Sequence, residues 1–398
     1  MSYLSVSLIG LLLLAGVAAM AAPKETYPDV EHLPVIADLP DPFLLPNGKR
    51  VTSAKEWEAH RKALLELVLH YEYGPLPPVP DHVTGTELTM RQIEATHATE
   101  REILLTMGPG DAVRTHLVLT IPAGKGPFPT IIRGDLCWGR LPPAIVAEVV
   151  GRGYALAEFD RTEIAPDSKE RGGVYAAYPD YHGGRSAAWA WGFHRVTDYL
   201  LQQTYVDRRH IVATGHSRGG KAVLLAGATD MRIALTAPNN SGCGGAGCFR
   251  YQAEKSEDIG AILKNFPFWF EPHFGDFIGK VDRLPFDQHT LKALVAPRAL
   301  LSTEGLGDLW ANPAGTQQTY LAAKEVYDFL GAGDHIGLHF RPGGHEHGME
   351  DWQSLLDFAD QQFFGKSVSR RFDALAFPDL PKAYSWVRPA SPIPAKRR

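Results

Sequence analysis

One short stretch of the chain, residues 209–221, has the pattern of a strand, a tight turn and the start of a helix. His210 to Thr214 is a β-branched run typical of a buried strand, and the G-x-S-x-G spacing follows in Gly215-His-Ser-Arg-Gly219. A serine at such a corner needs neighbours without side chains, so that the backbone can turn sharply and leave the hydroxyl exposed. The stretch therefore predicts Ser217 as a nucleophile at a helix N-terminus, where free N–H groups favour a developing negative charge. The alternative is a structural glycine turn.

Strand and helix patterns alternate along most of the chain. Two expected antiparallel entry strands are followed by six buried strands and the helices between them, which predicts a mainly parallel, doubly wound sheet with both faces covered. The expected strands are 102–106, 116–121, 130–132, 155–159, 210–214, 233–237, 298–302 and 336–340. The expected helices are 143–151, 186–202, one that continues from Ala222, 319–330 and 352–363.

The two ends of the chain differ in composition from the middle. Residues 1–21 contain an apolar run and end in Ala19-Met-Ala21, which fits signal-peptide cleavage and predicts a secreted or periplasmic protein without stable membrane association. No Lys or Arg precedes the apolar run, so an uncleaved anchor is the alternative. We expect an N-terminal extension over 22–95 with one helix near Lys55 to Tyr71, a catalytic domain over 96–368, and a poorly ordered proline-rich tail within 369–398.

Charge and cysteine content exclude several classes of protein. The net charge of −5 is mild and not gathered in blocks, so nothing indicates a nucleic-acid partner. Three cysteines are too few for a disulfide-built scaffold, and no C-x-x-C pair indicates zinc. Cys243 and Cys248 lie in one glycine-rich loop, where they either form a disulfide or are small buried residues. We expect a monomer that needs no cofactor and no metal.

A nucleophilic serine needs a base and an orienting acid, and in a doubly wound hydrolase sheet these follow the nucleophile at later strand ends. The base candidates are His345, which directly follows two glycines after the last expected strand, and His347; a His-x-His metal clamp is a third interpretation. The acid candidates after the strand at 298–302 are Asp308 and Glu304. We favour His345 and Asp308. At the end of the preceding strand stands Asn240, whose amide can orient an imidazole but cannot stabilise its positive form.

Two cations follow the serine closely. Arg218 and Lys221 begin a helix that the sheet should bury, where an unpaired cation is costly, so they are candidates for holding an oxyanion or a hydroxyl-rich substrate. Aromatic residues in neighbouring loops can stack on sugar rings, although each one alone is more often core packing. These are Trp138, Phe268, Trp269 and Trp310.

At these residues the chain resembles the glucuronoyl esterases, carbohydrate esterase family 15, particularly their bacterial members. The family signature G-C/H-S-R-x-G-K is matched from Gly215 to Lys221, with histidine in the variable second place. Four further segments look like family motifs, so that the likeness covers most of the mature chain. They are 189–192, 265–270, 308–313 and 344–352.

The resemblance implies an α/β-hydrolase fold in a three-layer sandwich and hydrolysis of the ester between 4-O-methyl-glucuronic acid of xylan and lignin alcohols. It also implies that Ser217 is the nucleophile, that Arg218 completes the oxyanion hole, and that Lys221 and Trp310 bind the sugar; Trp269 is our further candidate for that site. Many members place a glutamate where this chain has Asn240, whereas some bacterial members use an acid in the later loop, which matches Asp308.

The resemblance leaves the base open, because the fungal pattern favours the second histidine of the pair and the bacterial spacing favours the first. It implies no metal. Three other functions stay possible at this point. They are another carbohydrate ester as substrate, such as acetylated xylan; an inactive carbohydrate-binding homologue; and a membrane-anchored structural protein.

Overall fold

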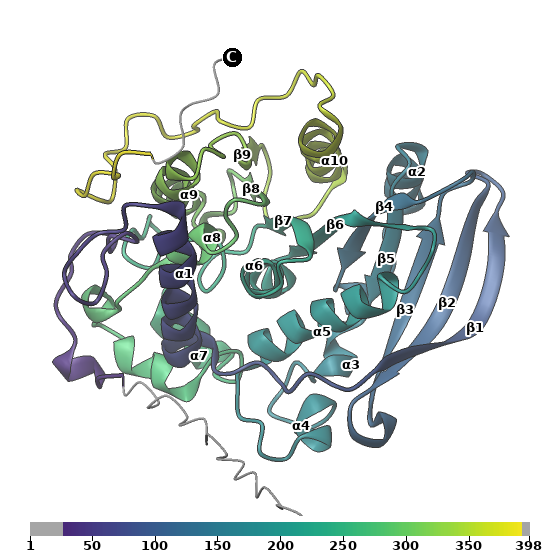
Figure 1. Ribbon diagram of the computed structural model, residues 1–398, viewed down its shortest axis with the longest axis horizontal. Coiled ribbons are helices and arrows are strands. Elements are labelled where there is room, and N and C mark those ends of the chain that lie inside the picture. Colours follow the sequence, from purple (N-terminus) through teal and green to yellow (C-terminus); the bar gives the residue numbers. More distant parts are fainter. Residues whose placement is uncertain (1–26, 392–398) are drawn as a thin grey trace, which may run out of the picture.

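The computed structural model describes residues 27–391, whose core is one nine-stranded sheet in the order β1-β2-β3-β5-β4-β6-β7-β8-β9 (Figure 1). β1 to β3 and β5 pair antiparallel in the order β1-β2-β3-β5, and β5-β4-β6-β7-β8-β9 are parallel. The strands are β1 (Val83–Ile93), β2 (Ala98–Met107), β3 (Val113–Ile121), β4 (Phe128–Arg133), β5 (Ala155–Phe159), β6 (Val206–His216), β7 (Ile233–Asn239), β8 (Ala299–Gly305) and β9 (Ile336–Arg341).

Helices cover both faces of this sheet. Figure 1 shows α2 and α10 on one side of the sheet and α5 and α6 on the other. The helices are α1 (Ala54–Val68), α2 (Pro143–Gly151), α3 (Arg161–Ile164), α4 (Val174–Ala177), α5 (Arg185–Leu200), α6 (Arg218–Thr229), α7 (Ile259–Asn265), α8 (Gln288–Ala293), α9 (Pro313–Phe329) and α10 (Met349–Phe364). The expected α/β-hydrolase architecture with a mainly parallel sheet is confirmed.

The strands alternate between two buried clusters, as the period of two in a strand requires. Ile211 and Ala213 of β6 belong to the larger cluster with α1, α5, α6 and α9, whereas Val212 between them belongs to the smaller cluster with α2 and α10. Leu300 and Leu301 of β8 divide in the same way. The parallel strands are therefore apolar on both faces, which is why each is visible in the sequence as a continuous apolar run.

The N-terminal extension wraps the larger cluster through α1, which agrees with the helix expected near Lys55 to Tyr71. Ser53 caps α1 by accepting a hydrogen bond from the backbone N–H of Glu56 at 3.2 Å. The long strand β1 was not expected from the sequence. It pairs with β2 and is exposed along almost its whole length, so its residues carry no apolar alternation.

The C-terminal segment corrects an expectation. Within the described residues it lies against the body of the protein, where Trp386 donates a hydrogen bond from Nε1 to the carbonyl of Leu39 at 2.8 Å and Tyr384 is buried. The expectation of a poorly ordered tail is therefore wrong for residues 378–391, because aromatic side chains fix a stretch whose composition is rich in proline.

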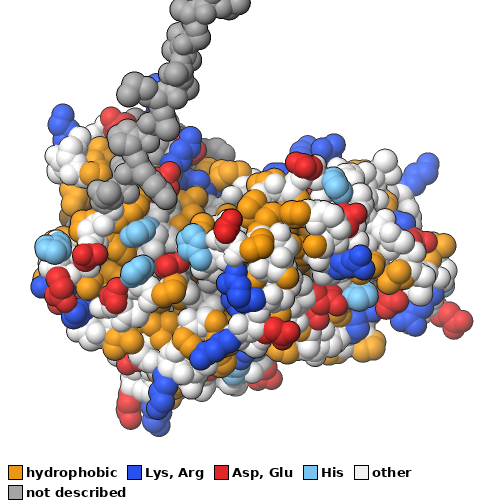
Figure 2. Space-filling view, turned by 90° about the horizontal axis from the view of Figure 1, so that it is seen from below, with side chains coloured by type: hydrophobic (Ala, Val, Ile, Leu, Met, Phe, Trp, Pro, Cys, Tyr) orange, Lys and Arg blue, Asp and Glu red, His pale blue; other side chains and the backbone are white. Residues whose placement is uncertain are grey.

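The cysteines are free thiols, so the interpretation of Cys243 and Cys248 as a disulfide is wrong and the buried-residue interpretation is right. No helix within residues 27–391 is long and apolar enough to span a bilayer. The expected signal peptide, residues 1–21, lies outside the described residues. On the face shown in Figure 2 acidic and basic side chains are interspersed and apolar side chains lie among them, as the mild net charge predicts.

Candidate active site

Ser217 occupies the corner between β6 and α6 in a conformation that side chains rarely adopt. Its φ is 55° and its ψ is −122°. The two flanking glycines are required by packing, because a Cβ on Gly215 would lie 2.7 Å from the backbone of Gly219, and a Cβ on Gly219 would lie 2.0 Å from Oδ1 of Asp135. The corner thus holds the hydroxyl above the carboxyl end of the sheet, at the first turn of α6.

His345 lies on the loop between β9 and α10 and faces Ser217. Its Nε2 is 2.9 Å from Oγ of Ser217. His347 points elsewhere, since its ring stacks on Trp352 with centroids 5.1 Å apart and on His216 at 6.0 Å. Burial holds the pKa of His347 well below its ordinary value. Of the two candidate bases, the structure brings His345 to the hydroxyl of Ser217, whereas the ring of His347 packs between His216 and Trp352.

Asp308 follows β8 and lies behind His345. Its Oδ2 is 2.5 Å from Nδ1 of His345 and accepts a second hydrogen bond from Nδ2 of Asn240 at 2.6 Å. The backbone N–H of Gly305 donates to Oδ1 of Asn240 at 3.3 Å, which fixes the orientation of that amide. Burial alone would raise the pKa of Asp308, but the hydrogen bonds from His345 and Asn240 outweigh it and hold that pKa below its ordinary value.

Glu304, the other acid candidate, lies within β8 and is fully buried. Its Oε1 accepts a hydrogen bond from Thr316 at 3.1 Å, and the cation of Lys292 lies near it. Burial raises its pKa and outweighs the attraction of Lys292. The structure therefore places Glu304 in a buried polar cluster under α9 and does not bring it to either histidine.

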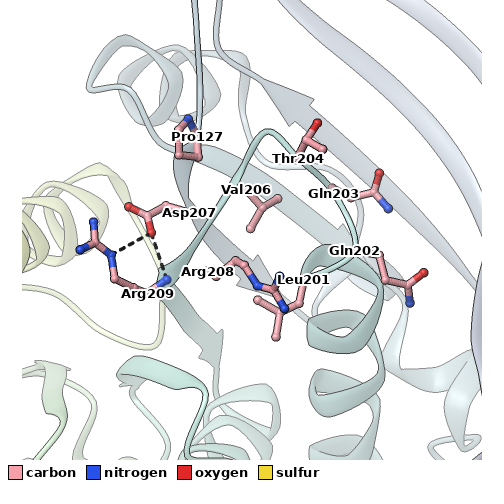
Figure 3. Close-up of a pocket in the computed structure, with 9 residues that line it drawn as sticks. All are labelled: Pro127, Leu201, Gln202, Gln203, Thr204, Val206, Asp207, Arg208 and Arg209. Carbon is pink, nitrogen blue, oxygen red and sulfur yellow. Dashed lines mark hydrogen bonds and ion pairs between the residues drawn. The ribbon is translucent and has the colours of Figure 1, made fainter.

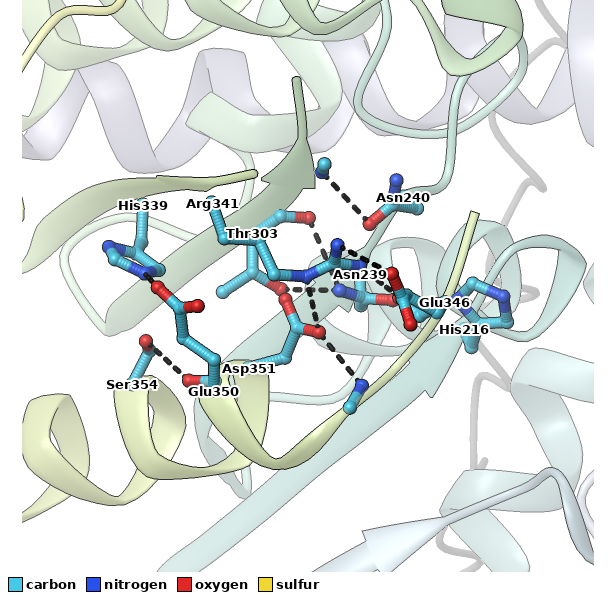
Figure 4. Close-up of polar contacts among 12 residues, drawn as sticks. His216, Asn239, Asn240, Thr303, His339, Arg341, Glu346, Glu350, Asp351 and Ser354 are labelled. Atoms are coloured by element: carbon cyan, nitrogen blue, oxygen red, sulfur yellow. Dashed lines mark hydrogen bonds and ion pairs between the residues drawn. The ribbon is translucent and has the colours of Figure 1, made fainter. Parts of the chain in front are cut away.

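His216 forms a second imidazole wall beside the site. Its ring centroid lies 4.5 Å from that of His345. Its Nδ1 is 2.6 Å from Oδ1 of Asn239, and Figure 4 labels His216 and Asn239. Because the amide nitrogen of Asn239 donates to Thr303 at 2.8 Å, its oxygen faces His216 and accepts from Nδ1–H. Burial lowers the pKa of His216 to about 4, so this ring is neutral near pH 7 and adds no positive charge beside His345.

A buried arginine holds the loop that carries His345 (Figure 4). Arg341, at the end of β9, pairs through Nε with Asp351 at 2.7 Å and donates to the carbonyls of Gly344 and Glu346. Asp351 also accepts the backbone N–H of Gly348 at 2.9 Å. His345 is thus placed by a network that joins β9, the loop after β9 and the first turn of α10.

Arg218 stands directly beside Ser217 and is fixed from two sides. Its guanidinium donates to Oδ2 of Asp167 at 2.7 Å and lies 4.6 Å from the ring of Trp269, whose Nε1 donates to the other oxygen of Asp167 at 2.7 Å. The first backbone N–H groups of a helix have no intrahelical acceptor, so the start of α6 adds further donors near the hydroxyl. A cation and N–H groups at this place suit the oxyanion of acyl transfer.

A cavity of about 270 Å³ opens beside the hydroxyl. Its lining combines the nucleophile and base candidates with cationic, acidic, amide and aromatic side chains, a mixture that suits a polar ring with several hydroxyls. The lining residues are Ser217, Arg218, Lys221, Asn240, Ser241, Gly242, Glu257, Asn265, Phe266, Trp269, Trp310, Ala311 and His345. Lys221, Trp269 and Trp310 therefore lie where the sequence analysis expects them, whereas Trp138 and Phe268 do not line this cavity.

Lys221 is buried and donates from Nζ to the carbonyls of Ser241 and Cys243. Its ammonium lies 3.9 Å from Glu257, and burial lowers its pKa while Glu257 opposes that effect. Burial likewise raises the pKa of Glu257, and Lys221 opposes this. Sequence reasoning missed Glu257 and Asp167, because each stands in a charged or polar loop with no recognisable motif and meets its partner through the fold.

A larger hollow of about 500 Å³ lies at the other end of β6, lined by the turn from α5 to β6 (Figure 3). Asp207 and Arg209 pair with each other there, and the pocket contains no serine, cysteine or histidine. It therefore offers no serine or cysteine nucleophile paired with a histidine base. Among residues 27–391 no three His, Cys, Asp or Glu side chains are grouped to hold a metal ion, so the His-x-His pair is not part of such a group.

Comparisons with known proteins show which family this chain belongs to. A family model described as "Glucuronyl esterase, fungi" matches residues 108–331. A 4-O-methyl-glucuronoyl methylesterase of Schizophyllum commune is 32% identical in an alignment of 340 positions that covers 82% of this chain and 82% of that protein. One of Podospora anserina is 34% identical over 79% of this chain, and the match spans 64% of that protein's length. The solved carbohydrate esterase family 15 glucuronoyl esterase of Caldicellulosiruptor kristjansonii superposes with a TM-score of 0.78 at 31% identity, covering 90% of this chain and 99% of that one.

Proposed function

Because this chain belongs to the glucuronoyl esterase family, carbohydrate esterase family 15, a family of carboxylic ester hydrolases, we propose that it hydrolyses esters whose acyl part is glucuronic acid or its 4-O-methyl ether. The natural substrate in this proposal is the ester between glucuronoxylan and lignin alcohols. The observation that carries the proposal is the contact of 2.9 Å between Oγ of Ser217 and Nε2 of His345, whose Nδ1 faces Asp308 at 2.5 Å.

The proposed reaction is a two-step acyl transfer. His345 takes the proton of Ser217 as Oγ attacks the uronate carbonyl carbon, and the Asp308 carboxylate stabilises the imidazolium. Arg218 and the N–H groups at the start of α6 hold the oxyanion. His345 then gives its proton to the alcohol oxygen, the C–O bond breaks and the alcohol leaves. Water, deprotonated by His345, attacks the acyl-serine; the bond between the acyl carbon and Oγ of Ser217 breaks, His345 returns the proton to Oγ, and the uronic acid leaves.

The cavity supports a sugar as the acyl group. Two of the three N–H groups of Lys221 are directed to backbone carbonyls, which leaves the third for a ring hydroxyl or for Glu257. Glu257 supplies acceptor oxygens on the same wall. The half-exposed indole of Trp310 and the buried indole of Trp269 complete it with apolar faces of the kind that pack against sugar rings.

The decisive experiment compares the wild type with Ser217→Ala on the methyl and benzyl esters of glucuronic acid and on an acetylated xylan. We expect the wild type to prefer the uronate esters and Ser217→Ala to lose at least about 10⁴ in kcat on them, with an unchanged circular dichroism spectrum. Ser369→Ala, an exposed serine after α10, is the matched control and should keep full activity. A preference for acetyl esters would move the proposal to another carbohydrate esterase, and failure of Ser217 to react with a phosphonate probe would indicate an inactive homologue.

We also propose that the chain is exported by its N-terminal segment and acts as a monomer. The proposal of export is supported by the apolar run followed by Ala19-Met-Ala21. Mass measurement of the protein recovered outside the cytoplasm should give a chain that begins at Ala22, and an intact N-terminus would instead support an anchor. Light scattering should give the mass of one chain.

A further inference from the structure

Trp138 is an exposed aromatic side chain beside the active site that the cavity does not use. It ends the short helical turn η4 (Leu136–Trp138) after β4, and 48% of its surface is exposed. Its ring centroid lies 6.0 Å from that of His216, whose own ring lies 4.5 Å from His345. Trp138 is therefore joined to His345 through a single intervening ring, and both Trp138 and His345 are exposed to solvent.

The indole of Trp138 packs against a buried arginine, Arg161. The fully buried guanidinium of Arg161 lies 4.3 Å from the ring of Trp138 and 5.2 Å from that of Trp189, so it is packed between two indoles. Arg161 is fixed in turn by its ion pair with Asp135 at 2.5 Å. Its Nε and Nη2 have no hydrogen-bond partner among residues 27–391, and its Nη1 also donates to the carbonyl of Gly134 at 3.2 Å. The guanidinium of Arg218 also lies 5.8 Å from the Trp138 ring, and 48% of the surface of Trp138 nevertheless stays open to solvent.

The chemistry of the proposed reaction indicates what the open surface contacts. The acyl sugar fills the cavity, and Trp138 is not among the residues that line it. The alkoxy oxygen must face Nε2 of His345 to receive its proton, so the alcohol group emerges beside His345. From there the neighbouring wall is His216 and then Trp138.

We propose that Trp138 is the binding surface for the alcohol part of the ester and that it selects aromatic alcohols, whose rings stack on the indole. This inference rests on the proposed uronate esterase function. Stacking on a preorganised indole contributes to the affinity for a ring and contributes little for a methyl group, because a methyl group covers little of the indole face. The residue thereby sets the preference among leaving alcohols, while the cavity sets the preference for the acid.

The test measures kcat/KM for benzyl and methyl glucuronate with the wild type and with Trp138→Ala. Both esters give the same acyl-enzyme, so a change in their ratio reports the step in which the alcohol is still bound. We expect the benzyl-to-methyl ratio to fall about threefold to tenfold in Trp138→Ala and to be largely kept in Trp138→Phe. Met231→Ala, an exposed apolar residue after α6, is the control and should leave the ratio unchanged.

The outcomes separate the inference from its premise. If the wild type cleaves both uronate esters and Trp138→Ala keeps their ratio within twofold, the role of Trp138 is refuted and the proposed function stands. If the wild type cleaves neither ester, the proposed function fails. Should Trp138→Ala not fold, Trp138→Gln keeps a planar group against Arg161 and removes the ring, and it should show the same fall in the ratio. Trp310→Ala provides a contrast, since it acts on the sugar side and should lower kcat/KM for both esters alike.

Discussion

Asn240 donates a hydrogen bond from Nδ2 to Oδ2 of Asp308 over 2.6 Å, and that same oxygen lies 2.5 Å from Nδ1 of His345. An amide at the end of β7 therefore supports the carboxylate that reaches the imidazole from the loop after β8. The arrangement assigns different roles to the two residues. In the proposed mechanism Asp308 is the acid that orients His345, and Asn240 positions that acid.

These roles predict unequal effects of substitution. Asp308→Asn removes the charge that stabilises the imidazolium and should lower kcat by roughly 10³–10⁴. Asn240→Ala removes one of two side-chain hydrogen bonds to Asp308 and should lower kcat by about tenfold. Steady-state kinetics on a glucuronate ester measure both. If Asn240→Ala silences the enzyme while Asp308→Asn does not, Asp308 is not the acid.

Gly219 should tolerate no side chain. A Cβ there would lie 2.0 Å from Oδ1 of Asp135, and that carboxylate cannot retreat because it accepts the N–H of His216 and pairs with Arg161. Gly219→Ala should therefore lower the melting temperature and cost at least about 100-fold in kcat/KM, since about 1 Å of misplacement at the nucleophile is enough for such a loss. Gly151→Ala, at the end of α2 with open space around its Cβ, is the matched control and should change neither quantity. Equal activity of the two variants would show that the corner is not constrained in this way.

The fold and the candidate catalytic groups could be predicted to the extent that they depend on local sequence pattern. The parallel strands bury both faces and carry apolar runs, so their places follow from the sequence, and Ser217, Asp308 and His345 follow from their order after successive strands. β1 could not be predicted, because an exposed edge strand has polar residues on both faces. The roles of three further residues could not be predicted from the sequence for a different reason. These residues are Glu257, Asp167 and Arg341. Each of them contacts a residue from a distant segment of the chain, and such a contact leaves no pattern of residue spacing within either segment.

Arg341 should act on the rate more than on substrate binding. It holds the loop of His345 through the carbonyls of Gly344 and Glu346 and through Asp351. Arg341→Lys keeps the positive charge beside Asp351 but loses the guanidinium N–H groups that donate to the carbonyls of Gly344 and Glu346. We expect kcat on a glucuronate ester to fall about 10- to 100-fold with KM changed by less than about threefold. Arg371→Lys, an exposed arginine paired with Asp373, is the control. A rise in KM at unchanged kcat would contradict a positioning role.

The pH dependence of stability should reveal a buried acid behind the site. Burial raises the pKa of Glu72 to about 8 from an ordinary value of 4.5, although hydrogen bonds from Tyr73 and Gln288 oppose this. Gln288 donates to Oε1 of Glu72 at 2.7 Å, while Oε2 of Glu72 and Oε1 of Gln288 have no hydrogen-bond partner within residues 27–391. An uncharged carboxyl avoids the cost of burying an ionised acid whose Oε2 receives no hydrogen bond. Glu72 is therefore held neutral in the folded protein.

A group whose pKa is raised on folding stabilises the protein fully below its unfolded pKa, and this contribution is lost as the pH rises through the folded pKa. The contribution of Glu72 thus falls between about pH 4.5 and pH 8. Glu72→Gln replaces the protonated acid by an amide of the same shape that cannot ionise. We expect it to match the wild type in free energy of unfolding at pH 4.5 and to exceed it by on the order of a few kcal/mol at pH 8.5, measured by urea denaturation at both pH values. The control Glu94→Gln, at an exposed position, should shift neither value. A difference between Glu72→Gln and the wild type that stays constant with pH would mean that Glu72 is ionised in the folded protein.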